Sequence, residues 1–115
     1  MEKFIYDLLS DDMIEEALSL YGAKNHKNLG GFENFVFEFE IDGKAFILRL
    51  SHSSHRSIDE VNSEIDFIYF LANNNANVAV PIRNKENTFT KMTLCKNDSY
   101  FTVAAFEKAE GERPT

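Results

Sequence analysis

Two strand-like segments on either side of an Asp-Gly dipeptide constrain the fold more than any other feature of this 115-residue sequence. Asp-Gly at residues 42–43 is a pair that type I′ hairpin turns favour. The segments ending at Ile41 and starting near Lys44 are therefore predicted to pair as antiparallel strands. Successive side chains of a strand point to opposite faces. In the first strand one face is predicted to hold Phe35, Phe37, Phe39 and Ile41, and the other Val36, Glu38 and Glu40.

The second of these segments, "KAFILRLSH", carries a charge on a face that is otherwise largely apolar. Burying an unpaired guanidinium costs several kcal/mol, so Arg49 calls for a carboxylate close by. Because guanidinium binds phosphate oxygens as a fork, an oriented arginine here also points to a local anion site. The two alternating faces hold Phe46, Leu48 and Leu50 on one side, and Ala45, Ile47, Arg49 and Ser51 on the other.

The longest predicted helix, residues 57–73, supplies the carboxylate. Ser57 is the expected N-cap, and acidic residues follow in the first turn. Glu64 occupies a position on the apolar stripe that leucine or isoleucine would otherwise take. We predict that Arg49 and Glu64 pair between the sheet and the helix. The alternative is that the face of Arg49 is solvated and Glu64 lies on the polar margin of a stripe formed by Val61, Ile65, Ile68 and Ala72.

Further helices and strands make the predicted fold α+β. Two short helices are expected between Glu2 and Tyr21, broken at "SDD", and Gly22 closes the second. After the long helix, "VAVPI", "TFTKMTLC" and "YFTVAAF" predict strand segments, the last two joined by the turn "KNDS". The expected architecture is one domain, an antiparallel sheet of about five strands with the long helix packed on it.

Composition argues against several classes of function. The net charge is −7 and no dense run of Lys or Arg occurs, which argues against nucleic acid as a partner. The single Cys95 cannot form an internal disulfide, and no Cys/His set has zinc-finger spacing, so a reducing, cytoplasmic setting is expected. No apolar run approaches the roughly 18 residues that a membrane span needs.

The histidines and the cysteine are not expected to form a site. His52 and His55 lack an apparent third metal ligand and are expected in a solvated loop. His26 is expected on the surface of a strand, and Cys95 is expected to pack against its neighbours.

A glycine pair, Gly30 and Gly31, precedes the first strand of the hairpin. Such a pair most often marks a turn, although it also lets backbone N–H groups approach a phosphate. The order of the features is more specific than the pair itself. A glycine-bearing hairpin, a strand with an internal cation and a helix with an inward Glu are the parts with which protein kinases cover phosphates, contact them and hold the cation.

With these features in this order, the sequence resembles the N-terminal lobe of the aminoglycoside phosphotransferase family, a kinase-like group that includes choline kinases and type II homoserine kinases. The matching stretches are "GGFENFVFEFEIDGKAFILRLS", "EVNSEIDFIYFLA", "VAVPI" and "YFTVAAFEKAEGERPT". The resemblance implies an N-terminal helical segment at 1–22, a kinase-like lobe at 23–106 and a hinge or linker at 107–115 that leads to a C-terminal lobe.

The resemblance also implies a nucleotide site and its cofactors, ATP and Mg²⁺. Arg49 would contact the α- and β-phosphates, with Glu64 as its helix partner, although many kinase-like proteins have Lys where this chain has Arg. A loop would lie over the phosphates and a hinge would hydrogen-bond the adenine edge. The loop residues are Gly30, Gly31, Phe32, Glu33 and Asn34, and the hinge residues are Phe106, Glu107, Lys108 and Ala109.

No H-x-D-x-x-x-x-N catalytic loop occurs in these 115 residues. The implied function is therefore the ATP-binding lobe of an enzyme that moves the γ-phosphate of ATP to a hydroxyl of a small molecule. The metal ligands are expected on a C-terminal lobe, and the isolated chain is predicted to transfer no phosphate and to self-associate through uncovered apolar surface. The acceptor stays open among an aminoglycoside, choline, homoserine, another small alcohol and a protein hydroxyl.

A second reading of the sequence is a non-catalytic α+β interaction module. In this reading an exposed sheet face would bind a protein partner through the aromatic residues Phe35, Phe37, Phe39 and Phe101.

Overall fold

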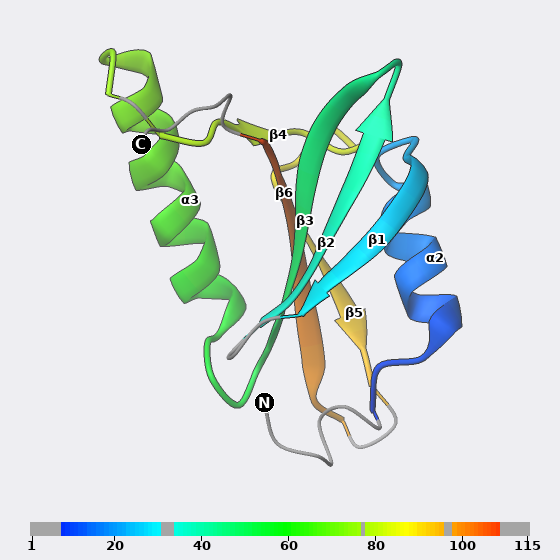
Figure 1. Ribbon diagram of the computed structural model, residues 1–115. Coiled ribbons are helices and arrows are strands. Elements are labelled where there is room, and N and C mark those ends of the chain that lie inside the picture. The colour runs from blue at the N-terminus through cyan, green and yellow to red at the C-terminus, as the bar shows by residue number, and fades with distance from the viewer. Residues whose placement is uncertain (1–7, 31–33, 77, 96–97, 109–115) are drawn as a thin grey trace.

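The computed structural model describes residues 8–30, 34–76, 78–95 and 98–108, which form an antiparallel sheet and two helices (Figure 1). The strand order is β1-β2-β3-β6-β4, and β5 also pairs with β6. The predicted α+β class is confirmed. In chain order the elements are α2 (Asp11–Ser19), β1 (Lys24–Gly30), β2 (Asn34–Ile41), β3 (Lys44–His52), α3 (Ile58–Asn73), β4 (Pro81–Ile82), β5 (Thr90–Leu94) and β6 (Tyr100–Glu107).

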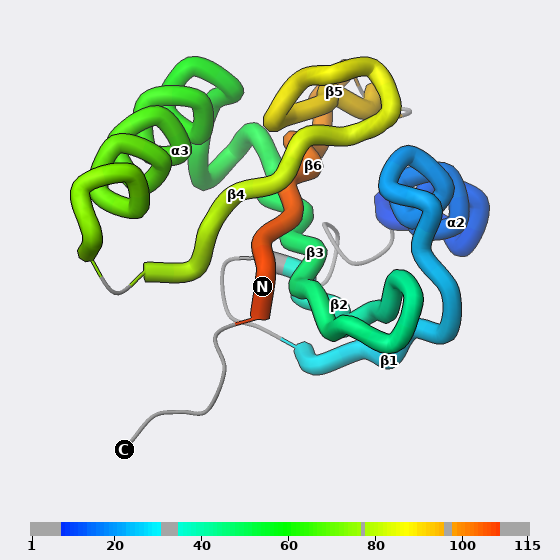
Figure 2. Tube along the Cα trace, turned by 90° about the horizontal axis from the view of Figure 1, so that it is seen from above, coloured from blue at the N-terminus to red at the C-terminus, as the bar shows by residue number. Residues whose placement is uncertain are grey.

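The two helices lie on opposite sides of the sheet, as the view from above shows (Figure 2). The α2 side holds the larger apolar core, in which Leu18 and Tyr21 pack against the buried face of the strands. The α3 side holds a smaller cluster, formed by Val61, Ile65, Ala104 and Phe106. The sheet therefore has one face that supplies most of the buried apolar area and a second face that is less filled.

The β2–β3 hairpin has the predicted turn and register. Asp42 and Gly43 both have positive φ angles, 51° and 84°, which a type I′ turn requires, and Ile41 lies opposite Lys44.

The interaction surface expected in the second reading of the sequence is wrong. Phe35, Phe37, Phe39 and Phe101 are all buried beneath α2, and Phe35 packs edge-on against Phe101 with ring centroids 5.8 Å apart. The alternation in the sequence identified one face correctly, but a period-2 pattern does not say whether a helix covers that face.

Capping side chains begin both helices. Ser10 accepts a hydrogen bond from the Met13 N–H at the start of α2. Ser57 and Glu60 form a reciprocal capping box at the start of α3, as predicted for the long helix. The first of the two short helices expected near the N-terminus falls largely outside the described residues. No helix in the described part of the chain is long and apolar enough to cross a membrane.

His52 is the residue whose environment differs most from the prediction. It was expected in a solvated loop, but β3 extends to His52, which lies opposite Phe101 of β6 and is only 2% exposed. Its Nδ1 accepts a hydrogen bond from the Ser54 N–H at 3.2 Å, and its Nε2 lies 2.9 Å from the Ser99 hydroxyl. His55 is exposed, as expected, because the chain turns away from the sheet after His52.

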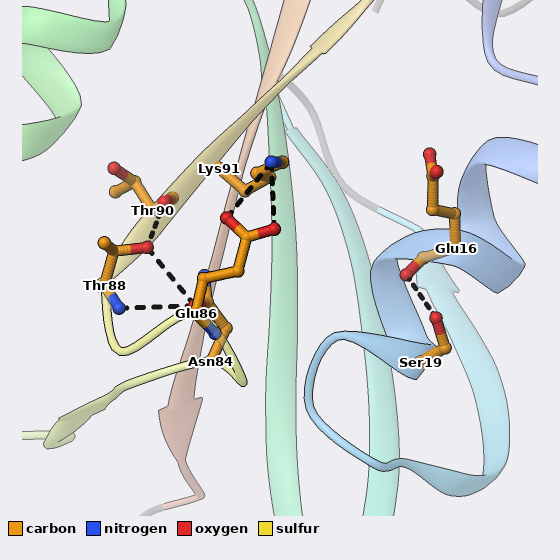
Figure 3. Close-up of polar contacts among 7 residues, drawn as sticks. All are labelled: Glu16, Ser19, Asn84, Glu86, Thr88, Thr90 and Lys91. Atoms are coloured by element: carbon orange, nitrogen blue, oxygen red, sulfur yellow. Dashed lines mark hydrogen bonds and ion pairs between the residues drawn. The ribbon is translucent and has the colours of Figure 1, made fainter.

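The loop between β4 and β5 is organised by Asn84. Its Oδ1 accepts hydrogen bonds from the Glu86 N–H and from the N–H and hydroxyl of Thr88; the contacts with Thr88 are drawn in Figure 3. The Lys85 N–H donates to the Leu20 carbonyl and ties this loop to the end of α2.

Tyr21 is buried next to this loop. Burial raises the pKa of its hydroxyl to about 12, and the neighbouring Asn84 side chain opposes that rise. The Tyr21 hydroxyl and the Asn84 Nδ2 are nevertheless both buried without a partner at hydrogen-bond geometry in the described residues, so desolvation dominates.

Ionisation of Tyr21 is expected to destabilise the fold at high pH. Its pKa is higher in the folded state than the usual 10, so its contribution to stability is complete below pH 10 and is lost as the pH rises towards 12. Relative to Tyr21→Phe, the wild-type free energy of unfolding should fall by about 2 kcal/mol between pH 10 and pH 12. Urea unfolding of both proteins at pH 9, 10, 11 and 12 measures this, and parallel pH profiles would contradict it.

Candidate functional site

Arg49 and Glu64 form the predicted ion pair between the sheet and the helix. The guanidinium meets the carboxylate as a fork, with Nη2 3.0 Å from Oε1 and Nη1 3.5 Å from Oε2. The side chains are 18% and 31% exposed, so the pair is largely removed from water. The alternative, a solvated face around Arg49, is wrong.

Three neighbours restrain the Arg49 side chain. In the sheet, Arg49 lies between Val36 of β2 and Ala104 of β6, so its stem is flanked on both sides by apolar residues. Its Cζ lies 5.2 Å from the centre of the Phe106 ring, a cation–π contact. Its Nε is buried with no hydrogen-bond partner among the described residues. Arg49 is therefore positioned at some energetic cost, since a buried N–H without a partner is unfavourable.

Arg56 joins this pair as a second cation, which the sequence reasoning missed. Its Nη1 lies 2.5 Å from Oε1 of Glu64, the oxygen that also accepts from Arg49. Arg56 stands eight residues before Glu64, in the turn between β3 and α3. Nothing in the sequence of this turn indicates that the Arg56 side chain points towards Glu64. Two positive charges and one negative charge leave this cluster with a net charge of +1, in a chain whose net charge is −7.

A pocket of about 320 Å³ lies beside this cluster, on the α3 side of the sheet. Most of its lining is apolar, which suits a flat, weakly polar group, and Arg49 adds a charged wall. The lining residues are Val36, Ile47, Arg49, Ile68, Val78, Ala79, Phe106, Glu107 and Lys108.

The end of β6 presents a backbone edge to this pocket. The Glu107 N–H donates to the Val80 carbonyl at 2.9 Å, and the Lys108 N–H donates to the Ala45 carbonyl on the opposite side at 3.2 Å. Because the N–H and C=O of one strand residue point to the same side, the Glu107 carbonyl faces the side of residues 78–80. Three predicted hinge residues thus line the pocket, and Ala109 lies outside the described residues.

Ion pairs attach the side chains of this edge to the neighbouring strands. Lys108 Nζ lies 3.1 Å from Oε1 of Glu38, and Lys44 Nζ lies 3.5 Å from Oε1 of Glu107. The two lysine side chains are 49% and 55% exposed, so each pair contributes little stability. The first pair ties Lys108, which lines the pocket, to β2, and the second joins the start of β3 to the end of β6.

The glycine hairpin starts at the end of the sheet where the β3–α3 turn lies. Gly30 has a φ of +84°, and a Cβ added there would meet no atom within 4 Å. Glycine is therefore favoured there by the backbone conformation and not by crowding. Asn34, the first residue of β2, lies opposite Ser51 near the end of β3. Gly31, Phe32 and Glu33 lie outside the described residues, so the expected contact of this loop with phosphate stays a prediction.

A double-mutant cycle measures how strongly Arg49 and Glu64 interact. Because the pair is forked and partly buried, we expect a coupling energy of about 1–3 kcal/mol between Arg49→Ala and Glu64→Ala in urea unfolding. The exposed pair Lys91 and Glu86, also bonded through both carboxylate oxygens at 3.1 Å, is the matched control and should couple by less than about 0.5 kcal/mol. Equal coupling in the two cycles would show that the buried pair has no special role.

Comparison with known proteins identifies relatives for this arrangement. No model of a protein family matches the chain. An amicoumacin kinase of Bacillus subtilis (strain 168) is 27% identical over 105 residues, which are 90% of this chain and 31% of that protein. The chain thus spans about a third of the length of this curated relative.

Solved structures give the same result. An amicoumacin kinase in complex with AMP-PNP, Ca²⁺ and Ami superposes on the whole chain and on 36% of its own length, with a TM-score of 0.91 and 25% identity. An aminopropanol kinase associated with a microcompartment has a TM-score of 0.75 at 19% identity, over 91% of this chain and 33% of its own.

A spectinomycin phosphotransferase in complex with ADP and spectinomycin has a TM-score of 0.61 at 17% identity, over 90% of this chain and 30% of its own. The last two likenesses concern the fold alone. Together with the amicoumacin kinases, they confirm the resemblance predicted from the order of the motifs: the chain has the fold of the N-terminal lobe of kinases of the aminoglycoside phosphotransferase family.

Proposed function

We propose that this chain is the ATP-binding lobe of a kinase-like enzyme that moves the γ-phosphate of ATP to a hydroxyl of a small molecule. The observation that carries the proposal is the apolar pocket bounded by the backbone edge of Glu107 and by Arg49 in its ion pair with Glu64. An apolar space, a backbone acceptor and a cation suit the adenine ring, its amino group and the phosphates respectively.

The residues of the pocket fit an adenine nucleotide. In this proposal the base lies between the apolar side chains of Val36 and Ile47 and those of the segment before β4. The exocyclic amino group of adenine donates to the Glu107 carbonyl, and the phosphates extend towards Arg49. The residues 23–106 act as the lobe, and 107–115 act as the hinge that leads to a C-terminal lobe.

Phosphoryl transfer needs groups that this proposal places outside the chain. The described residues contain no cluster of His, Cys, Asp and Glu that could hold a metal ion, so the ligands of Mg²⁺ are assigned to a C-terminal lobe. The amicoumacin kinase structure, which contains AMP-PNP and Ca²⁺, supports a nucleotide and a divalent cation at such a site. The isolated chain is expected to bind nucleotide and to transfer no phosphate. With a single cysteine, it is assigned to the reducing cytoplasm.

A tryptophan placed in the pocket tests nucleotide binding directly. Ala79 lines the pocket, whereas Ala76 is exposed in the same segment and does not line it, so Ala76→Trp is the matched control. Ala79→Trp should weaken the binding of ATP and of adenosine at least tenfold, because the indole fills the space for the base. Titration calorimetry measures the affinity for both ligands. Because the chain has no tryptophan of its own, the fluorescence of the introduced tryptophan gives a second measure of binding. Equal affinities for the two variants would overturn the proposed site.

The isolated chain is also expected to self-associate through apolar surface. Phe67 and Phe70 on α3 and Leu94 at the end of β5 are 62%, 59% and 71% exposed. Replacing both phenylalanines by serine should lower the average mass measured by light scattering at about 0.1 mM, if α3 carries the contact. Leu94→Ser is the control on a different element. An unchanged mass in the double variant would show that α3 is not the contact surface.

A further inference from the structure

Arg56 is held in place more firmly than a residue in a connecting turn usually is. Its own N–H and that of His55 both donate to the His52 carbonyl, at 3.1 and 3.0 Å. The Ser53 N–H donates to the Tyr100 carbonyl at 2.8 Å, and the capping box of Ser57 follows directly. The turn between β3 and α3 is therefore anchored at both ends, and it presents Arg56 from a rigid backbone.

The side chain of Arg56 is the more accessible of the two guanidinium groups. It is 38% exposed, compared with 18% for Arg49, although both donate to Oε1 of Glu64. Arg49 uses both of its Nη atoms on the carboxylate, whereas Arg56 uses only Nη1 there. Arg56 thus keeps more of its N–H groups available to an anion, and one carboxylate cannot neutralise both cations.

Arg56 does not line the pocket itself, but the turn that carries it lies towards the end of the site where the phosphates are proposed to lie. The turn that carries it leaves β3 at the end where Asn34 and Ser51 pair and where the glycine hairpin joins β2 (Figure 1). The opposite end of β3, around Ala45, lies next to the Glu107 edge that is proposed to hold the base. A nucleotide that extends from the base edge past Arg49 therefore has its outer phosphates on the side from which Arg56 reaches in.

We propose that Arg56 is a second phosphate-binding cation of this site, held beside Arg49 by their shared carboxylate, Glu64. The ligand class is a nucleoside diphosphate or triphosphate, for which Arg49 serves the inner phosphates and Arg56 the outer ones. This inference rests on the proposed function. It predicts that the site discriminates nucleotides by the number of their phosphates, and not only by their base.

A series of ligands that differ only in phosphate number tests the assignment. Titration calorimetry compares adenosine, AMP, ADP and ATP on the wild-type chain, on Arg56→Gln and on Arg83→Gln. Arg83 is the matched control, since it is an exposed arginine that stacks on Phe89 at 4.3 Å and does not line the pocket. We expect Arg56→Gln to weaken ATP and ADP about tenfold, to leave adenosine unchanged and to lessen the salt dependence of ATP binding. Arg83→Gln should change none of these.

The outcomes separate the two proposals. If the wild-type chain binds neither ATP nor adenosine, the proposed function fails and the inference fails with it. If the wild type binds ATP and Arg56→Gln binds it equally well, the inference alone is overturned. A uniform loss across all four ligands would show that Arg56 only positions Glu64, and would also overturn it.

An NMR measurement on the wild-type chain tests the proposal even if Arg56→Gln does not fold. Tripolyphosphate, used alone as the probe, should shift the guanidinium ¹⁵N resonances of both Arg49 and Arg56, assigned through Arg49→Lys and Arg56→Lys. Shifts confined to Arg49 would contradict the assignment. Arg56→Lys should also keep part of the ATP affinity, because it retains the charge and loses the fork.

Discussion

The contact of Arg49 with Glu64 determines how α3 sits on the sheet. The apolar cluster beneath α3 is small, with Val61 and Ile65 of the helix facing Ala104 and Phe106 of β6, so packing alone defines its position weakly. A forked ion pair adds direction, because both partners must keep their orientation to hold two bonds. Removing one partner of such a pair is far more costly than replacing both by apolar residues, which makes it a device for positioning rather than for stability.

The sheet separates stability from the candidate site. Phe46, Leu48 and Leu50 of β3 point into the core under α2, while Ile47 and Arg49 of the same strand point into the pocket on the α3 side. Since adjacent residues of a strand face opposite sides, a single strand can serve both purposes. The well-filled face can supply most of the buried apolar area, which leaves the other face free to hold a pocket, a pair of arginines and a buried nitrogen without a partner.

Prediction from the sequence succeeded where neighbouring residues carried the signal, and where two opposite charges each interrupted an apolar pattern. The Asp42-Gly43 turn and the capping box at Ser57 follow from neighbouring residues. Arg49 and Glu64 were identified because each interrupts an apolar pattern, so that each needed an unusual partner. Arg56 interrupts no pattern, because a charged residue in a turn is ordinary. Its role became visible only when the turn folded back towards Glu64.

What the sequence by itself determined is the set of strands and helices, the face of each that is apolar, and the one charge pair that had to be buried together. Only the tertiary structure decided which apolar face is covered and which stays open. Phe35 and Phe101 belong to the core because α2 lies over them, and His52 is buried because β3 continues to pair with β6. Periodicity describes one element at a time, whereas burial depends on which other element packs against it, and that is decided by contacts between residues far apart in the chain.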